Sequence, residues 1–306
     1  MKKSFSYNQG FAIAILGTLL FSTKAIWIKL CFRESNINAT SLLTLRMLLS
    51  LPFYIIILWS IKRNGKARET SNKTYLWAIA MGLLGYYASS LFDFIGLQYV
   101  SAGIERIILF IYPTLAVLIN YWIFKVPIIK KQWWAILVTY AGIGLAYWSE
   151  INQFQNTELF IFGSIMVLLC GITYALYLVG TGKLIPKMGA TQYTSVAMLS
   201  ATAGIFTHFC ITEPINSIPQ YIHPNHPIFV YVIGLALIAT VIPSFLLSTG
   251  MKRIGSNDLA IVTSIGPVST LFQARYLLNE PFSLLQILGT LLVIIGVLMV
   301  KKSAID

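Results

Sequence analysis

The chain has 306 residues, of which 57% are hydrophobic and only 10% are charged, and its mean hydropathy is +0.76. Because a soluble protein carries about a quarter charged residues, this composition excludes a water-soluble fold and predicts a protein whose solvent is largely lipid. The net charge of +12 does not indicate nucleic-acid binding, since the basic residues stand in short polar segments between apolar runs.

The apolar runs predict an all-α integral membrane protein with ten transmembrane helices. A spanning helix needs about 20 mostly apolar residues, and the polar breaks divide the chain into ten such runs. In chain order they cover residues 9–31, 40–61, 75–98, 102–124, 131–148, 159–180, 191–212, 228–249, 256–278 and 283–300.

The basic residues between these runs predict the orientation of the chain. With ten spans, all the loops rich in Lys and Arg fall on one side, together with both termini, and Arg33 is the only cation on the other side. Positive charge is retained on the cytoplasmic side of a membrane. We therefore expect a multi-pass protein of the bacterial cytoplasmic (inner) membrane with both termini in the cytoplasm.

The chain also repeats itself at an offset of 154 residues, as in 281 − 127 = 154. The matching residues are Pro127 and Pro281, Gln132 and Gln286, Gly17 and Gly171, Lys29 and Lys183, Pro113 and Pro267, and Gly142 and Gly296. This predicts two domains, residues 1–152 and 153–306, with five spans each. An odd number of spans inverts the second repeat relative to the first, as in many secondary transporters.

Several stretches resemble EamA-type members of the drug/metabolite transporter superfamily. They include "LRMLLSLPF", "GLQYVSAGIERIILFIYPTLAVLINYWIF" and "GPVSTLFQARYLLNEPFSLLQILGTLLVIIGVLM". The most specific residues are Pro267, Glu280, Pro281, Gln286, Gly289 and Gly296. The chain departs from the family at Val126, where an acid is usual. The resemblance implies a ten-helix carrier whose central cavity is enclosed by four helices of each half, with substrates that include amino acids, other metabolites, nucleotide-linked sugars and drugs.

Charged residues inside apolar runs are candidates for function, because an unpaired charge in hydrocarbon costs at least ~2.5 kcal/mol. We expect Lys24 or Arg46 to receive a substrate carboxylate or phosphate, and Asp93 and Arg106 to form a structural pair or an outer gate. Salt bridges that only hold helix ends together are the alternative reading. Proton coupling or solute exchange is left open, with Asp93 as the one named proton carrier.

Aromatic residues and prolines inside the spans complete the candidate site. An aromatic lining would suit a flat or apolar solute or a cation, although such side chains more often pack. The aromatic candidates are Trp27, Tyr86, Tyr112, Tyr174 and Tyr177. Pro113, Pro243 and Pro267 interrupt helices and are expected to act as hinges.

Motifs for chemistry are missing: the chain has no HExxH, GxSxG or P-loop pattern. We therefore expect no enzyme activity, no cofactor and no bound metal. The sequence predicts a secondary transporter that moves a small metabolite, such as an amino acid or a related solute, by alternating access, with efflux as the favoured direction. A channel-like pore and a non-transporting receptor or assembly subunit are the alternatives. The expected partners are the solute and membrane lipid, without nucleic acid, and the oligomeric state is left open.

Overall fold

The computed structural model describes residues 2–302 apart from 66, 126, 152–155, 215–217, 219, 220, 222, 264 and 282. Within these described ranges the regular elements are helices, as expected for an all-α membrane protein. They are α1 (Lys2–Ser22), α2 (Lys24–Glu34), α3 (Ala39–Arg63), α4 (Asn72–Gly82), η1 (Leu83–Ala88), α5 (Ser89–Gly96), α6 (Ala102–Leu109), α7 (Tyr112–Phe124), α8 (Lys130–Ile151), α9 (Thr157–Met188), α10 (Ala190–Thr212), α12 (Phe229–Ala236), η3 (Leu237–Val241), α13 (Ile242–Thr263), α14 (Gly266–Gln273), η4 (Ala274–Leu278) and α15 (Leu284–Lys302).

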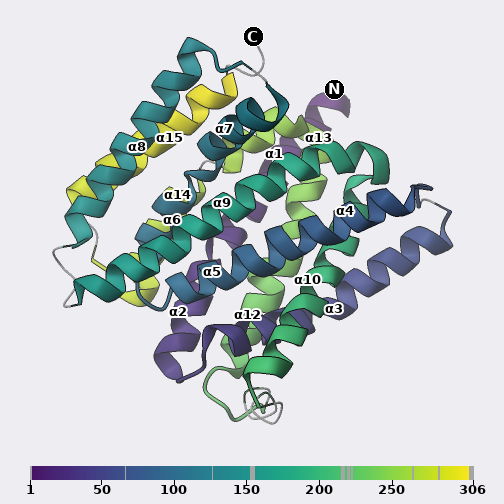
Figure 1. Ribbon diagram of the computed structural model, residues 1–306, viewed down its shortest axis with the longest axis horizontal. Helices are drawn as coiled ribbons and strands as arrows, with labels where there is room; N and C mark the ends of the chain where they lie inside the picture. The colour runs from purple at the N-terminus through teal and green to yellow at the C-terminus, as the bar shows by residue number, and fades with distance from the viewer. Residues whose placement is uncertain are drawn as a thin grey trace.

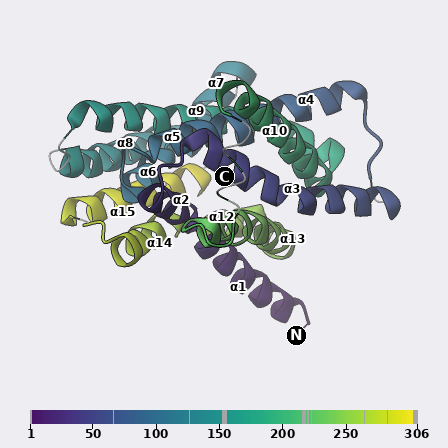
Figure 2. The same cartoon turned by 90° about the horizontal axis from the view of Figure 1, so that it is seen from below.

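The helices pack in two layers (Figures 1 and 2). One layer contains α4, α9 and α10, and the other contains α1, α12, α13 and α14, with α3 running between them. Helices α8 and α15 lie side by side along one edge of the molecule. The largest buried apolar cluster joins side chains of α2, α3, α5, α10 and α12, and so draws on both halves of the chain.

Seven helical segments of the described chain are long and apolar enough to cross a membrane, and the shorter segment Leu284–Met299 adds an eighth apolar helix. The count of ten spans is therefore not confirmed. The expected fifth and ninth spans, residues 131–148 and 256–278, are not among these segments, although the fifth forms the helix α8. Helix α13 runs on through the turn expected near residues 250–255, and the chain beyond it continues as the short helices α14 and η4.

The repeat reappears in irregular backbone features. The π-helical segments η1 and η3 begin at residues related by the offset, since 237 − 83 = 154. Lys125 and Asn279 are related in the same way. They are the non-glycine residues with positive φ among those described, at 57° and 58°, and each one ends a helix before an X-Pro pair. Val126, which follows Lys125, lies outside the described residues, as does the expected boundary between the repeats at residues 152 and 153.

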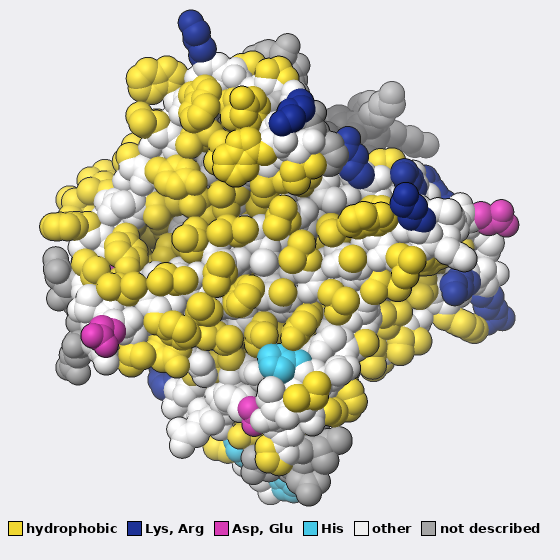
Figure 3. Space-filling view, viewed as in Figure 1, with side chains coloured by type: hydrophobic (Ala, Val, Ile, Leu, Met, Phe, Trp, Pro, Cys, Tyr) yellow, Lys and Arg dark blue, Asp and Glu magenta, His cyan; other side chains and the backbone are white. Residues whose placement is uncertain are grey.

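Exposed apolar side chains form a wide band across the face shown in Figure 3, with charged side chains gathered at its edges. We call one edge the basic end, because α3, α7 and α9 finish there with Arg63, Lys125 and Lys187 close to their last turns. The opposite end carries Glu158 and Glu213, at the start of α9 and the end of α10. An apolar band between polar edges is what a lipid bilayer requires of a protein surface.

Candidate functional site

A network of four charged side chains is buried between α2, α5 and α6. The Nζ atom of Lys24 lies 2.7 Å from Oδ2 of Asp93 and 3.6 Å from Oε1 of Glu105. The Nε atom of Arg106 lies 3.8 Å from Oε2 of Glu105. All four side chains are buried, and Glu105 has no exposed surface. We expected Asp93 to pair with Arg106, but the structure pairs Asp93 with Lys24, because α2 rather than α6 brings the nearer cation.

Several atoms of this network have no hydrogen-bond partner among the described residues. They are Oδ1 of Asp93, both carboxyl oxygens of Glu105, and Nε and Nη2 of Arg106. Such atoms are rare in protein interiors, because a buried polar group without a partner loses its hydration and gains nothing in return. The network is therefore held together by charge more than by complete hydrogen bonding.

Arg46 occupies a separate buried position between the two repeats. Its Nε donates a hydrogen bond of 2.9 Å to Oγ1 of Thr240, and its guanidinium carbon lies 5.5 Å from the ring centroid of Phe94. Thr240 belongs to the π-helical segment η3 and donates in turn to the carbonyl oxygen of Leu235, five residues back. The extra residue in that turn places the hydroxyl where the arginine can reach it.

The structure brings four of the predicted aromatic residues into one row. The rings of Tyr112 and Tyr174 are 5.1 Å apart, those of Tyr174 and Tyr177 5.6 Å, and those of Tyr177 and Tyr86 5.1 Å. The hydroxyl of Tyr177 donates to that of Tyr86 at 3.1 Å. These edge and tilted contacts are favourable aromatic geometries, so the row packs α7 and η1 against α9.

Trp27 lies elsewhere. Its indole N–H donates to Oγ1 of Thr23 at 3.0 Å, its ring sits 6.1 Å from that of Tyr231, and it covers Gly234 of α12. A Cβ at position 234 would come within 2.8 Å of the indole ring. Trp27 therefore packs α2 on α12 and does not join the tyrosine row.

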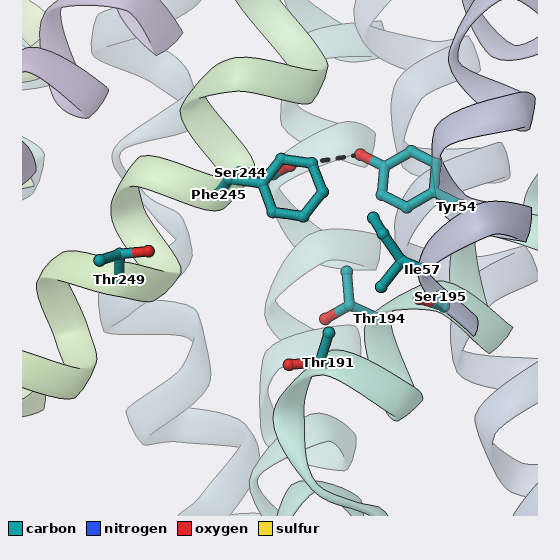
Figure 4. A pocket seen from close by; sticks show the side chains of 8 residues that line it. All are labelled: Tyr54, Ile57, Thr191, Thr194, Ser195, Ser244, Phe245 and Thr249. Atoms are coloured by element: carbon teal, nitrogen blue, oxygen red, sulfur yellow. Dashed lines mark hydrogen bonds between the residues drawn. The ribbon is translucent and has the colours of Figure 1, made fainter. Parts of the chain in front are cut away.

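A cavity of about 190 Å³ opens between α3, α10 and α13, towards the basic end (Figure 4). Its lining is mostly hydroxyl-bearing, and consists of Tyr54, Ile57, Thr191, Thr194, Ser195, Ser244, Phe245 and Thr249. The hydroxyl groups of Tyr54 and Ser244 face each other at 3.4 Å across the cavity. Among the described residues of this lining, none is charged.

One face of α3 connects the cavity to Arg46. Arg46, Ser50 and Tyr54 follow one another at intervals of four residues and so lie along one side of the helix. Each contacts the α12–η3–α13 segment, at Thr240, at the carbonyl oxygen of Ala236 (3.5 Å from Oγ of Ser50) and at Ser244. These three side chains form a polar row on α3, here called the polar line, that runs from the cavity to the buried guanidinium group of Arg46.

Two of the three predicted hinge prolines mark the starts of helices. Pro113 and Pro267 are the second residues of α7 and α14, each directly after a break in the helix that precedes it. Pro243 is the second residue of α13, directly after η3. The positions of Pro113 and Pro267 suit proline, because the first helical residues have no intrahelical partner for an N–H group. Pro243, by contrast, lies inside a continuous helix, because α13 follows η3 without a break.

The residues that carried the family resemblance hold the opposite end together. Both carboxyl oxygens of Glu280 accept from the backbone N–H of Ala102, at 3.2 and 3.0 Å, where α6 begins. An anion at a helix N-terminus is favourable. Burial raises the pKa of the Glu280 carboxyl, and the charge of Lys29 partly offsets this shift. Gln286, buried on α15, donates to Oε2 of Glu150.

Glu280-Pro281 thus joins the start of α15 to the start of α6. Gly296 lets α15 approach α8 closely, because a Cβ there would meet the carbonyl oxygen of Ala135 at 2.8 Å. These contacts give the family motif a role in helix packing.

Thr240 and the residues that line the cavity are not among the candidates predicted from the sequence. The repeat could have indicated Thr240 as a candidate, because 86 + 154 = 240 makes it the counterpart of Tyr86 in the second repeat. No such indication pointed to the serine and threonine residues of the cavity, since these residues are common in helices that cross membranes.

Comparisons with known proteins agree with this fold. A model of the EamA-like transporter family matches residues 8–148 and again residues 161–301. The uncharacterized transporter YcbK of Bacillus subtilis is 29% identical over 285 residues, which cover 92% of this chain and 88% of YcbK. An uncharacterized transporter of Archaeoglobus fulgidus is 22% identical over 283 residues, 92% of this chain and 93% of its own. A crystal structure of a protein 15% identical in sequence superimposes with a TM-score of 0.64, covering 97% of this chain and 98% of that one.

Proposed function

Because the chain belongs to the EamA-like transporter family, and is a membrane transporter, we propose that it carries a small metabolite by alternating access between its two repeats. The metabolite is an amino acid or a solute of similar size, and efflux is the favoured direction. The proposal places the protein in the bacterial cytoplasmic membrane with its basic end towards the cytoplasm, and assigns residues 1–152 and 153–306 to the two repeats.

The cavity between α3, α10 and α13 is the observation that carries this proposal. It lies where the repeats meet, since α3 belongs to the first and both other helices to the second. Secondary transporters hold their substrates at such interfaces. Hydroxyl groups that line the cavity suit the polar parts of a small solute, and the polar line on α3 leads from them to Arg46, which would receive an anionic group of the solute.

The test begins with a thermal-shift screen of the purified protein against metabolites, since a ligand that binds the folded state raises its melting temperature. Any stabilising solute is then loaded into proteoliposomes, and uptake of the labelled solute is measured. A carrier gives saturable uptake that unlabelled solute on the far side accelerates. Conductance that never saturates would indicate a channel, and binding without flux would indicate a receptor.

Two substitutions connect the flux to the cavity. Thr194→Val removes a lining hydroxyl and should raise the solute concentration needed for half-maximal uptake by roughly 10-fold, the equivalent of one lost hydrogen bond. Thr207→Val is the matched control, because Thr207 lies on the same helix with an exposed side chain whose hydroxyl donates to the carbonyl oxygen of Ala203. Equal behaviour of the two variants would remove the cavity from the path.

Arg46→Gln tests the anionic-group assignment. Glutamine keeps a donor for Thr240 but removes the charge, so uptake of an anionic solute should fall at least 10-fold while the protein still folds. If Arg46→Gln and Lys24→Gln both leave uptake and protein level unchanged, neither residue engages the solute.

A further inference from the structure

The carboxyl groups of Asp93 and Glu105 lie against each other within the buried network. They come from different helices, α5 and α6, yet lie 2.7 and 3.6 Å from the same Nζ atom of Lys24, which brings them within hydrogen-bonding reach of one another. Two ionised carboxylates cannot form a hydrogen bond with each other, because neither has a hydrogen to donate. In a medium of low dielectric they also repel strongly. Their contact therefore requires a proton on one of them.

The distribution of partners indicates which carboxyl group holds that proton. Asp93 has Lys24 at 2.7 Å from its Oδ2, a short charge-assisted hydrogen bond that favours the ionised form. Glu105 receives no hydrogen bond on either oxygen among the described residues, and its nearest cations are 3.6 and 3.8 Å away. A fully buried carboxylate with no donor is costly, so protonated Glu105 is the favoured state.

A single proton on Glu105 also provides a hydrogen-bond partner for both carboxyl groups. The Glu105 O–H would point to Oδ1 of Asp93, which otherwise has no donor within the described part of the chain. It satisfies that oxygen and gives the Glu105 carboxyl a partner. Two carboxyl groups that share one proton are a recurrent arrangement where proteins handle protons.

The surroundings of the pair contain few other groups that could exchange its proton. The charged or titratable side chains that act on the pair are Lys24 on α2, Arg46 on α3, Arg106 on α6 and Cys170 on α9, and Tyr112 on α7 and Tyr174 on α9 lie beyond them towards Arg106. Asp93 and Glu105 are the only carboxyl groups among these described side chains. Glu105 and Asp93 are therefore the groups that can load and release a proton.

The pair is also placed to sense helix rearrangement. Lys24 is the first residue of α2, directly after the break at Thr23 between α1 and α2. Glu105 lies on α6, which ends at Leu109 before the break that precedes Pro113. Release of the Glu105 proton adds a negative charge beside Asp93, which would draw Lys24 and Arg106 towards Glu105 and shift the helices at these two breaks.

We propose that Asp93 and Glu105 form a proton-binding site, with one proton held as Glu105 O–H donating to Asp93, and that its loading and release couple proton movement to transport. The proton enters from water on one side and leaves to water on the other, without any other bond changing. The coupling rests on the transport function proposed above, whereas the shared proton does not.

Infrared spectroscopy of the protein in lipid nanodiscs tests the shared proton without any solute. A protonated buried carboxyl absorbs at a C=O stretching frequency that a carboxylate lacks. At neutral pH the wild type should show this band, and Glu105→Gln should lose the component of it that belongs to Glu105. Asp93→Asn should shift it, because the hydrogen bond changes. Glu150→Gln and Glu280→Gln, which alter two further acids among the described residues, should retain the Glu105 component. A band that survives in Glu105→Gln unchanged, or no band in the wild type, overturns the site.

A second measurement tests the coupling, with a pH-sensitive dye inside proteoliposomes and the solute found in the exchange assay. Wild type should change the internal pH when the solute moves. Glu105→Gln should move the solute with at least a 10-fold smaller pH change. Solute movement without any pH change in the wild type overturns the coupling and leaves the transporter intact. If no solute moves at all, the proposed transport fails, and the infrared result alone still supports or overturns the proton site.

Discussion

Lys24 is the cation on which the buried network depends, because it lies within 4 Å of both acids. Its replacement by methionine keeps the length of the side chain but leaves Asp93 buried without a positive partner. Removing one member of a buried ion pair typically costs about 3 kcal/mol or more. We expect Lys24→Met to lower the unfolding free energy by that amount, measured by denaturant or thermal unfolding of the purified protein in detergent.

An exposed ion pair supplies the control for this prediction. Arg33 and Glu34 are 3.0 Å apart at the surface, where such pairs contribute roughly 0–1 kcal/mol. Arg33→Gln should therefore change the unfolding free energy far less than Lys24→Met. The double variant Lys24→Met with Asp93→Asn should recover part of the loss, because no unpaired charge remains on Asp93. Equal losses for the single and double variants would show that Lys24 acts by packing and not by charge.

For individual residues, the sequence predicted which side chains are buried and charged better than it predicted which partners they contact. Lys24, Asp93 and Arg106 stood out because a charge in an apolar run needs a protein partner. Which partner each one takes depends on the rotation of α2, α5 and α6 about their axes, and an isolated sequence does not determine that rotation. Trp27 and Tyr86 looked alike for the same reason, although one packs on Gly234 and the other joins the tyrosine row.

Among the helices, α8 and α15 approach each other closely at glycine residues. A Cβ at position 289 would lie 2.5 Å from the carbonyl oxygen of Gly142 and 2.8 Å from Cβ of Ala146. Small residues allow such contact between membrane helices. We expect Gly289→Ala to force the pair apart and to lower the unfolding free energy by about 1–3 kcal/mol, as overpacking generally does.

Gly144 offers the matched control for this pair of helices. It lies on α8 two residues beyond Gly142, and a Cβ there would meet nothing within 4 Å. Gly144→Ala should leave the melting temperature unchanged or raise it slightly, because alanine favours a helix over glycine. A loss of stability as large as that of Gly289→Ala would contradict the close contact at residue 289.

The helices themselves were predictable to different degrees. The apolar runs at 40–61 and 191–212 correspond to α3 and α10. Helix α3 begins after the capping residue Asn38, and α10 lies between Gly189 and Glu213. The π-helical segments η1 and η3 were not predicted, because hydrophobicity does not report an extra residue in a turn. The turn near residues 250–255 was predicted from Lys252 and Arg253, but the backbone stays helical there through Thr263.

The orientation of the molecule in the membrane can be tested directly. Asn64, at the end of α3, and Asn225, between α10 and α12, are both exposed at opposite ends of the molecule. In a Cys210→Ser background, which removes the exposed native thiol and leaves Cys31 and Cys170 buried, an impermeant maleimide should label Asn225→Cys in intact cells. Asn64→Cys should react only after the membrane is opened. Labelling of both from one side would rule out the proposed orientation.

The inverted repeat explains why the two halves share turns, prolines and π-helical segments, yet the halves differ in one respect. The buried charged residues of the site, Lys24, Arg46, Asp93, Glu105 and Arg106, all belong to the first half, and their counterparts are Leu178, Ser200, Leu247, Leu259 and Ala260. Two identical halves could exchange conformations at no energetic cost, so that inward-open and outward-open forms would be isoenergetic. Here the halves are not equivalent, because exchanging their conformations would change the surroundings of these five charged side chains. A gap of about 1.4 kcal/mol already favours one form tenfold, so we expect the unloaded protein to rest facing one compartment.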